Sequence, residues 1–277
     1  MQLTDFFQAL PWLFIGLAVI LRLKALKLSG VTSALIAILY SFKMLGTLAL
    51  QWLYTYYYPQ RGTADIFRFY DDGLILFEVA KGNIGHYTRI MCGLYDPVDG
   101  FKSIYFEQMN SWIKPFEGGL YNDNIIMIKL NSMLTIITQS GYEANSLLFS
   151  AFAFSGLVLI IKTVVDNPEW RSHALLIIGL LPSYLLFLSR GLKESVLLIG
   201  AGMPFLGYYN AFNSNNKWLG IVQLAIGCWL LIIIKPYFIA SILPAILVYQ
   251  ITQRLKLQSY FSWGIWGVNY RNWSHFS

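Results

Sequence analysis

Long runs of apolar residues fill nearly all of this chain outside one polar segment, and they leave few folds open to it. Of the 277 residues, 56% are hydrophobic and only 12% are charged, whereas a soluble globular domain carries about 25% charged residues. A helix of about 20 largely apolar residues crosses a bilayer. The predicted fold class is therefore all-α, a polytopic helical membrane protein of about seven transmembrane helices plus a long extracytoplasmic loop with amphipathic helices.

The candidate spans divide the chain into four parts. Residues 1–58 hold the first two spans, 59–144 the extracytoplasmic loop, 145–253 a bundle of helical hairpins, and 254–277 a cytoplasmic or interfacial tail in which an unfinished span could begin. The expected spans are 9–27, 31–54, 145–165, 173–190, 194–212, 217–235 and 237–253. Very short corners separate the last five, so their directions must alternate. A re-entrant segment at 194–212, which contains Pro204, would reverse everything after it.

Basic residues set the orientation, because cytoplasmic loops are enriched in lysine and arginine. Placing Arg22, Lys24 and Lys27 inside brings further cations to the same side: Lys162, Arg171, Lys217, Arg254 and Lys256. The opposite orientation would expose these eight basic residues outside. The favoured orientation puts residues 59–145 outside, together with ten of the fourteen carboxylates.

The extracytoplasmic loop is expected to contain two helices. Thr63 is a plausible N-cap for the first, which Gly82 would close. The second is expected from Asn124 to Thr138. Helices with an apolar face beside a bilayer lie on its surface or cover a cavity.

Three aspartates of the first loop helix are the candidate catalytic residues: Asp65, Asp71 and Asp72. Asp65 and Asp72 are seven residues apart and share a helix face. Arg68 has the spacing for a surface ion pair with Asp71. A carboxylate at the membrane surface can take a proton from a sugar hydroxyl as a general base. The alternative is that these aspartates are helix acids on a solvated face.

Three cations lie in corners on the predicted outer side, where they do not serve as ordinary topology anchors. Arg190 and Lys193 are three residues apart, with Glu194 beside them, and Lys235 precedes a proline at the next outer corner. Arginine binds phosphate bidentately, and lysine adds a mobile point charge. Acids and cations on one membrane face predict a site for an anionic, lipid-borne substrate. The alternative for each cation is snorkelling toward lipid headgroups.

The remaining polar residues give weaker signals. Lys43 lies near the middle of the second span, where structural pairing or snorkelling is favoured over substrate contact. His86 could act as an outer-face acid or base, and Asn131 and Asn145 are expected to pack. The histidines and cysteines lack metal-ligand spacing, so no cofactor is predicted; a divalent metal stays open without support. The cytoplasmic-side cations account for much of the net charge of +6, so no nucleic-acid partner is implied.

Several segments of the chain resemble the membrane-embedded GT-C class of glycosyltransferases. They are TADIFRFYDDG in the outer loop, LPSYLLFLSRGLKES and IIIKPY at the outer corners, and LNSMLTIITQSGYEANSLLFSAF, which is similar to short bacterial members found with exopolysaccharide or O-antigen genes. The resemblance covers about residues 31–250. The chain departs from the class in having two predicted spans before the loop instead of one, and in being shorter than most members.

The resemblance implies a polyprenyl-phosphate-linked sugar as donor and a glycan or lipid as acceptor. It also implies an outer-face aspartate as base and basic residues that bind the departing phosphate. Asp65 matches the base, with Asp71 and Asp72 as alternatives. The phosphate contacts are matched by Arg190, Lys193 and Lys235.

The leading interpretation is a glycosyltransferase or polysaccharide polymerase at the outer face of a bacterial inner (plasma) membrane, active in cell-envelope polysaccharide biosynthesis. One alternative is a transporter of lipid-linked glycans, which would need the cations but not the carboxylates. The other is a non-catalytic accessory membrane subunit. Transport predicts polar residues near the midplane of several spans. Because Lys43 is the only such candidate expected near the midplane of a span, the pattern favours chemistry at an interface.

Overall fold

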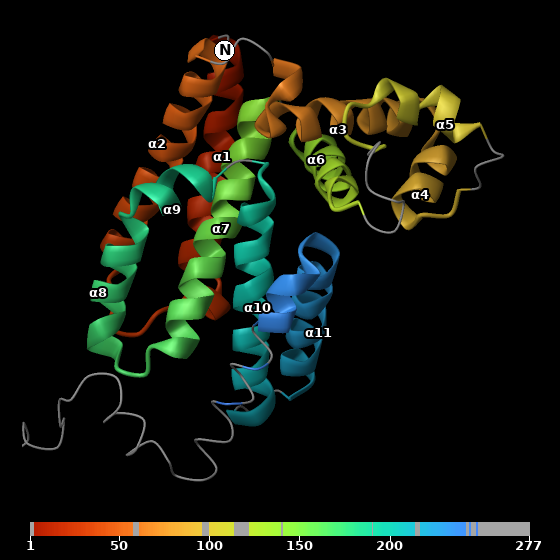
Figure 1. The fold of residues 1–277 in the computed structure, drawn as a ribbon. Helices are drawn as coiled ribbons and strands as arrows, with labels where there is room; N and C mark the ends of the chain where they lie inside the picture. The colour runs from red at the N-terminus through yellow and green to blue at the C-terminus, as the bar shows by residue number, and fades with distance from the viewer. Residues whose placement is uncertain are drawn as a thin grey trace, which may run out of the picture. The chain divides into compact units, whose positions relative to one another are not determined.

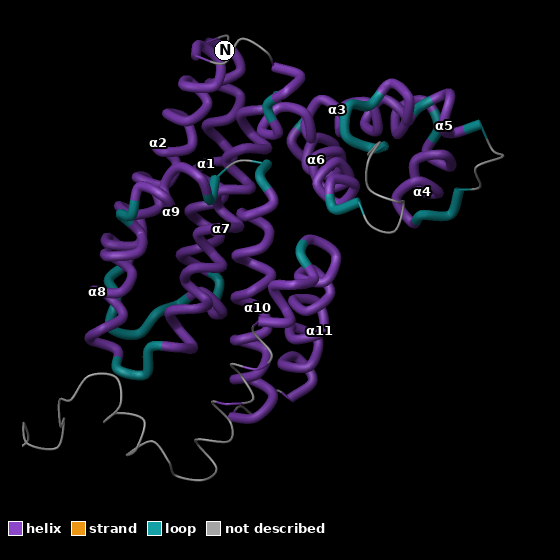
Figure 2. Tube along the Cα trace, viewed as in Figure 1, coloured by secondary structure: helices purple, strands orange, loops and turns teal. Residues whose placement is uncertain are grey.

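The computed structural model describes residues 3–57, 61–95, 100–113, 122–139, 141–189, 191–213, 217–241, 244 and 248. The regular elements in this part of the chain are all helical (Figures 1 and 2). The chain divides into two units, Met1–Ile234 and Lys235–Ser277. The first unit contains every labelled helix.

Three helices of the described residues are long and apolar enough to cross a membrane, which indicates a membrane protein. They are α2 (Ser33–Tyr57), α7 (Tyr142–Val164) and α11 (Lys217–Ile234). Helices α1 (Leu3–Arg22) and α10 (Lys193–Asn213) occupy two more of the predicted spans, and each contains a proline, Pro11 and Pro204 respectively. Most of the last predicted span, 237–253, lies outside the described residues.

The span expected at 173–190 is not one helix. The chain forms α8 (Pro168–Gly179), then breaks and forms α9 (Pro182–Phe187). Pro182 has no N–H to continue a helix and disfavours helical geometry in the residue before it. Leu181 accordingly has φ −59° and ψ 128°. A break of this kind leaves main-chain groups without helical partners inside the bundle.

Lys43 of α2 binds carbonyls in the last turn of α9, the short helix that follows this break. Its ammonium donates to the carbonyl of Tyr184 at 2.5 Å and to that of Leu185 at 3.4 Å. The side chain is fully buried, and its nitrogen lies 4.5 Å from the centre of the Tyr184 ring. A charged residue in a span is thus explained by structural pairing, because the last carbonyls of α9 need donors.

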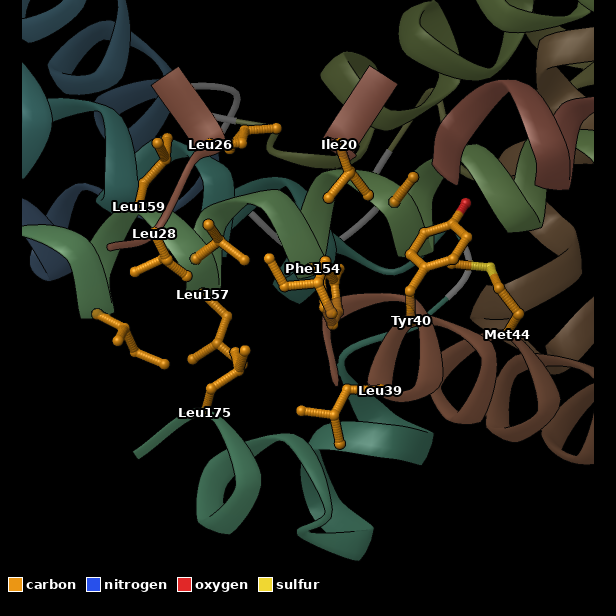
Figure 3. Packing of buried hydrophobic residues seen from close by; sticks show 14 of the residues in the cluster. Ile20, Leu26, Leu28, Leu39, Tyr40, Met44, Phe154, Leu157, Leu159 and Leu175 are labelled. Atoms are coloured by element: carbon orange, nitrogen blue, oxygen red, sulfur yellow. The ribbon is translucent and has the colours of Figure 1, made fainter. Parts of the chain in front are cut away.

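The bundle is built around α7, which packs on α1, α2 and α10, while α10 packs on α11. Apolar side chains from several of these helices form the core. Figure 3 shows Tyr40 of α2 beside Phe154 of α7, and their rings meet edge to face with centroids 5.6 Å apart. Glycine permits the close approach of α7 to α10, because a Cβ at Gly156 would lie 2.4 Å from the Leu198 carbonyl oxygen. The short helix η1 (Lys24–Leu26) joins α1 to α2 and also contacts α7.

Between α2 and α7 the chain forms a group of shorter helices, which we call the α3–α6 segment. These are η2 (Arg61–Thr63), α3 (Asp65–Gly82), α4 (Ile84–Cys92), α5 (Phe101–Ile104), η4 (Phe106–Gln108) and α6 (Asn124–Thr138). Figure 1 shows this segment beside the end of the bundle at which α2 ends and α7 begins. The predicted helix Asn124–Thr138 is confirmed. Thr63 as N-cap is wrong, because Ala64 holds that position and Thr63 belongs to η2.

Candidate functional site at the corner before α10

The corner between α9 and α10 lies against the α3–α6 segment. Leu192 packs on a cluster of buried residues that includes Ile66 and Tyr70 of α3 and Tyr142 of α7. A Cβ at Gly191 would lie 3.4 Å from Asn131 Nδ2 of α6. The corner that carries the predicted phosphate-binding cations is therefore covered by helices of the predicted loop.

Lys193, the first residue of α10, forms an ion pair with a carboxylate of the loop. Its Nζ lies 2.5 Å from Oδ2 of Asp123, and the two side chains are only 16% and 18% exposed. The same nitrogen lies 5.5 Å from the centre of the Phe69 ring of α3. A pair this far removed from solvent interacts more strongly than a surface pair. Arg190 lies outside the described residues, so its distance from Asp65 is not defined.

Asp65 is the most accessible of the three predicted aspartates. It begins α3, and its side chain is 61% exposed. Its Oδ1 lies 3.5 Å from Nη1 of Arg68. An exposed pair of this length holds the carboxylate weakly, so Asp65 remains available to an incoming group.

Asp71 is paired with a different arginine from the one that its spacing predicts. Arg61 donates from Nε to Oδ2 at 2.9 Å and from Nη2 to Oδ1 at 2.7 Å. The predicted pair with Arg68 is wrong, because Arg68 turns toward Asp65 and toward the carbonyl of Asn110 at 3.0 Å. Bidentate contacts of the Arg61 kind fix a carboxylate in place.

Asp72 is fully buried and holds the chain between η4 and α6 against α3. It accepts hydrogen bonds from the backbone N–H groups of Asn110 at 2.8 Å and Ser111 at 2.7 Å. Burial raises the pKa of its carboxyl, while these N–H groups and the charge of Arg68 lower that pKa in part. Asp65 and Asp72 flank Arg68 on one helix face, as their spacing predicts, but only Asp65 is open to solvent.

Polar groups without partners lie in the helix ends that reach the corner. Glu143 of α7 is 5% exposed and accepts a hydrogen bond from Nε2 of Gln51 at 2.7 Å. Oε1 of Gln51, Oγ of Ser146 and Oγ of Ser195 are buried and have no hydrogen-bond partner within the described chain. Buried polar atoms in native proteins almost always have a partner. The helix ends beside the corner therefore bury three polar atoms whose hydrogen-bonding capacity is unused within the described chain.

The remaining predicted site residues are His86, Glu194 and Lys235. His86 belongs to an aromatic cluster within the α3–α6 segment, where its Nδ1 lies 2.9 Å from the Tyr105 hydroxyl and its ring 5.0 Å from that of Phe101. Glu194 follows Lys193 in the first turn of α10 and is partly exposed. Lys235 begins the second unit, in which its carbonyl accepts a hydrogen bond from the N–H of Phe238 at 2.9 Å.

Sequence reasoning missed Asp123 and the buried pair of Glu143 with Gln51. Asp123 stands in the stretch NDN at 122–124, which has no distinctive spacing, and only the tertiary fold brings it to Lys193. Glu143 could have been found from its position, because it is an acidic residue at the start of a long apolar run. Asn131 and Asn145 pack as expected, with Nδ2 of Asn145 donating to the carbonyl of Asn131 at 3.1 Å. Among the described residues, no three histidine, cysteine or acidic side chains form a metal-binding group.

Comparison with known proteins identifies no relative of this chain. The chain matches no protein-family model, no curated protein and no solved structure. The similarity to GT-C glycosyltransferases thus rests on the sequence segments alone.

Proposed function

We propose that this protein is a membrane-embedded glycosyltransferase or polysaccharide repeat-unit polymerase that uses a polyprenyl-phosphate-linked sugar at the outer face of a bacterial inner membrane. The observation that supports it best is the 2.5 Å contact between Lys193 and Asp123. It joins a cation from a corner of the bundle to an acid of the α3–α6 segment. In the proposed orientation, a lipid-borne phosphate would reach this cation from the bilayer, and a hydrophilic acceptor would arrive from solvent.

In the proposed reaction, the oxygen of an acceptor hydroxyl attacks the anomeric carbon of the donor sugar. The bond between that carbon and the phosphate oxygen breaks, and its electron pair leaves with the polyprenyl phosphate. Lys193, with Arg190 near it in sequence, stabilises the charge that develops on the phosphate. Binding of the phosphate displaces Asp123 from Lys193, because the two anions compete for one cation.

The proton of the acceptor hydroxyl passes to a carboxylate of the α3–α6 segment. Asp65 is the first candidate, since its side chain is 61% exposed. Asp123 is the second, because phosphate binding would release its carboxylate beside the reacting groups. Asp71 and Asp72 are weaker candidates, because one is held by Arg61 and the other is buried against Asn110 and Ser111.

The test is turnover of a polyprenyl-phosphate-linked sugar by purified protein reconstituted in lipid. Lys193→Met is expected to lower kcat about 10²–10³-fold, as loss of a group that stabilises transition-state charge does. Of Asp65→Asn and Asp123→Asn, the variant that lacks the base is expected to lose about 10²–10⁴-fold. Lys81→Met is the matched control, because Lys81 is an exposed lysine paired with Glu78.

Three results would contradict parts of the proposal. If Lys193→Met turns over substrate as fast as Lys81→Met, the assigned phosphate contact is wrong. If Lys193 is needed for binding of the lipid-linked sugar while the protein releases no polyprenyl phosphate, the protein carries or moves the lipid and does not catalyse transfer. Full activity of both aspartate variants would remove the base from the mechanism.

A further inference from the structure

A second polar site lies at the other end of α7 from Lys193. It is a pocket of about 670 Å³ between η1, the end of α7, the start of α8 and the end of α10. Its lining includes three cations and one acid: Lys27, Lys162, Arg171 and Asp166. The proposed glycosyl transfer does not use this pocket, so a test of one site does not decide the role of the other.

Neutral main-chain and hydroxyl groups hold two of these cations in place. The ammonium of Lys162 donates to the carbonyls of Lys24 at 3.1 Å and Ala25 at 2.7 Å. The guanidinium of Arg171 donates to the carbonyls of Val165 at 2.8 Å and Lys162 at 3.2 Å, and to the Ser29 hydroxyl. These contacts position both charges without neutralising either one.

Unused donors remain in the pocket. An arginine has five N–H donors and a lysine three, so two N–H groups of Arg171 and one of Lys162 stay unbonded beside those hydrogen bonds. Within the described part of the chain, the exposed Lys27 ammonium makes no hydrogen bond or ion pair, and none of the three cations pairs with Asp166. The pocket therefore has uncompensated positive charge and free donors, which suit a phosphate group.

The surroundings of the pocket fit a membrane surface. Trp170 of α8 and Val164 of α7 are each 57% exposed, and Tyr209, which lines the pocket, is 49% exposed. Aromatic side chains collect at the level of lipid headgroups. Basic pockets between transmembrane helices bind anionic headgroups on the cytoplasmic side, which is the side that the cation distribution predicts for Lys27, Lys162 and Arg171.

We propose that this pocket binds the phosphate of an anionic membrane phospholipid. Lys27 contributes a cation that is free to move toward the headgroup, while Lys162 and Arg171 contribute fixed charges. The acyl chains would lie along the apolar surface near Val164. A free phosphate ion has the same charge chemistry but lacks the acyl chains.

The experiment measures binding of phosphatidylglycerol and of phosphatidylcholine to the detergent-purified full chain by native mass spectrometry, with inorganic phosphate as a competitor. Lys27→Gln is expected to weaken phosphatidylglycerol binding about five-fold, the effect of one lysine near a membrane surface. Its exposed side chain makes no hydrogen bond or ion pair within the described chain, so the variant should fold. Lys24→Gln is the matched control, because Lys24 lies one helical turn away in η1 but does not line the pocket.

Support requires that phosphatidylglycerol bind more tightly than phosphatidylcholine and that only Lys27→Gln reduce this preference. Equal binding of the two lipids would overturn the proposal, and so would equal losses in Lys27→Gln and Lys24→Gln. If millimolar inorganic phosphate displaces the lipid completely, the pocket is a site for free phosphate and the lipid assignment is wrong. None of these outcomes affects the turnover test at Lys193.

Discussion

Two buried charges of this protein bind main-chain groups instead of other charges. Lys43 donates to carbonyls of α9, and Asp72 accepts from the N–H groups of Asn110 and Ser111. The sequence shows a charge in an apolar run but does not show its partner, because Lys43 and Tyr184 are 141 residues apart. The same limit hid Asp123, whose partner Lys193 is 70 residues away.

Lys43→Met tests whether this lysine stabilises the broken helix. The substitution keeps the length and apolar stem of the side chain but leaves the carbonyls of Tyr184 and Leu185 without a donor. A buried group that loses its partner costs about 1–3 kcal/mol of free energy of unfolding. Thermal unfolding in detergent should show a lower Tm for Lys43→Met and an unchanged Tm for Lys81→Met. An unchanged Tm in both would mean that α9 does not depend on the lysine.

Asp72 should give the protein a pH-dependent stability of known sign. Its folded-state pKa is raised by burial, so the folded protein holds this proton more tightly than the unfolded chain does. The free energy of unfolding therefore falls as pH rises from about 3.9, the ordinary aspartate pKa, to the raised value, and stays lower above it.

Asp72→Asn removes this titration. Tm is compared between acid and neutral pH. We expect Tm of the original protein to fall more on raising the pH than Tm of Asp72→Asn does. Asp71→Asn serves as the control, and its Tm should fall with rising pH as much as that of the original protein. An equal pH dependence in the original protein and Asp72→Asn would contradict a raised pKa at this position.

Helices with local signals could be predicted from the sequence, whereas breaks and starts set by neighbours could not. The helix Asn124–Thr138 was predicted to the residue, because apolar periodicity and flanking turn residues mark both of its ends. The break before Pro182 was not predicted because it lies within an apolar run, and the partner of the short helix that follows it, Lys43, comes from another helix. In the candidate site, the sequence pointed to Lys193 and to the acidic segment, but the pairing with Asp123 depends on how α6 packs beside the corner.

The contact between α7 and α10 depends on a small residue at its closest point. In Gly156→Ala, the added methyl would lie 2.4 Å from the Leu198 carbonyl oxygen, so the helices must move apart. Overpacking of this kind costs about 1–3 kcal/mol. Tm in detergent should fall for Gly156→Ala but not for Gly82→Ala, because a Cβ at Gly82 meets nothing within 4 Å. Equal Tm values for the two variants would show that the α7–α10 contact is not close-packed.

At the scale of the whole bundle, the charged side chains of the two proposed sites lie near the two ends of α7. At one end, Lys193 and Asp123 meet beside the α3–α6 segment. At the other, Lys27, Lys162 and Arg171 line a pocket near the end of α7. If α7 crosses the membrane, these two sites face opposite aqueous compartments. The proposed transfer reaction then requires the α3–α6 segment to be outside.

Measuring the side of the membrane on which the α3–α6 segment lies is the most direct test of this arrangement. The native cysteines allow this measurement. Cys92 is exposed at the end of α4, so Cys228→Ser leaves it as the only cysteine of the chain. A partner variant with both cysteines replaced by serine and with Lys24→Cys reports on the other end of the bundle. Both are treated in spheroplasts with a membrane-impermeant maleimide. We predict labelling of Cys92 in intact spheroplasts, and labelling at position 24 only after permeabilisation. Labelling of both from outside, or protection of Cys92 until permeabilisation, would contradict the account.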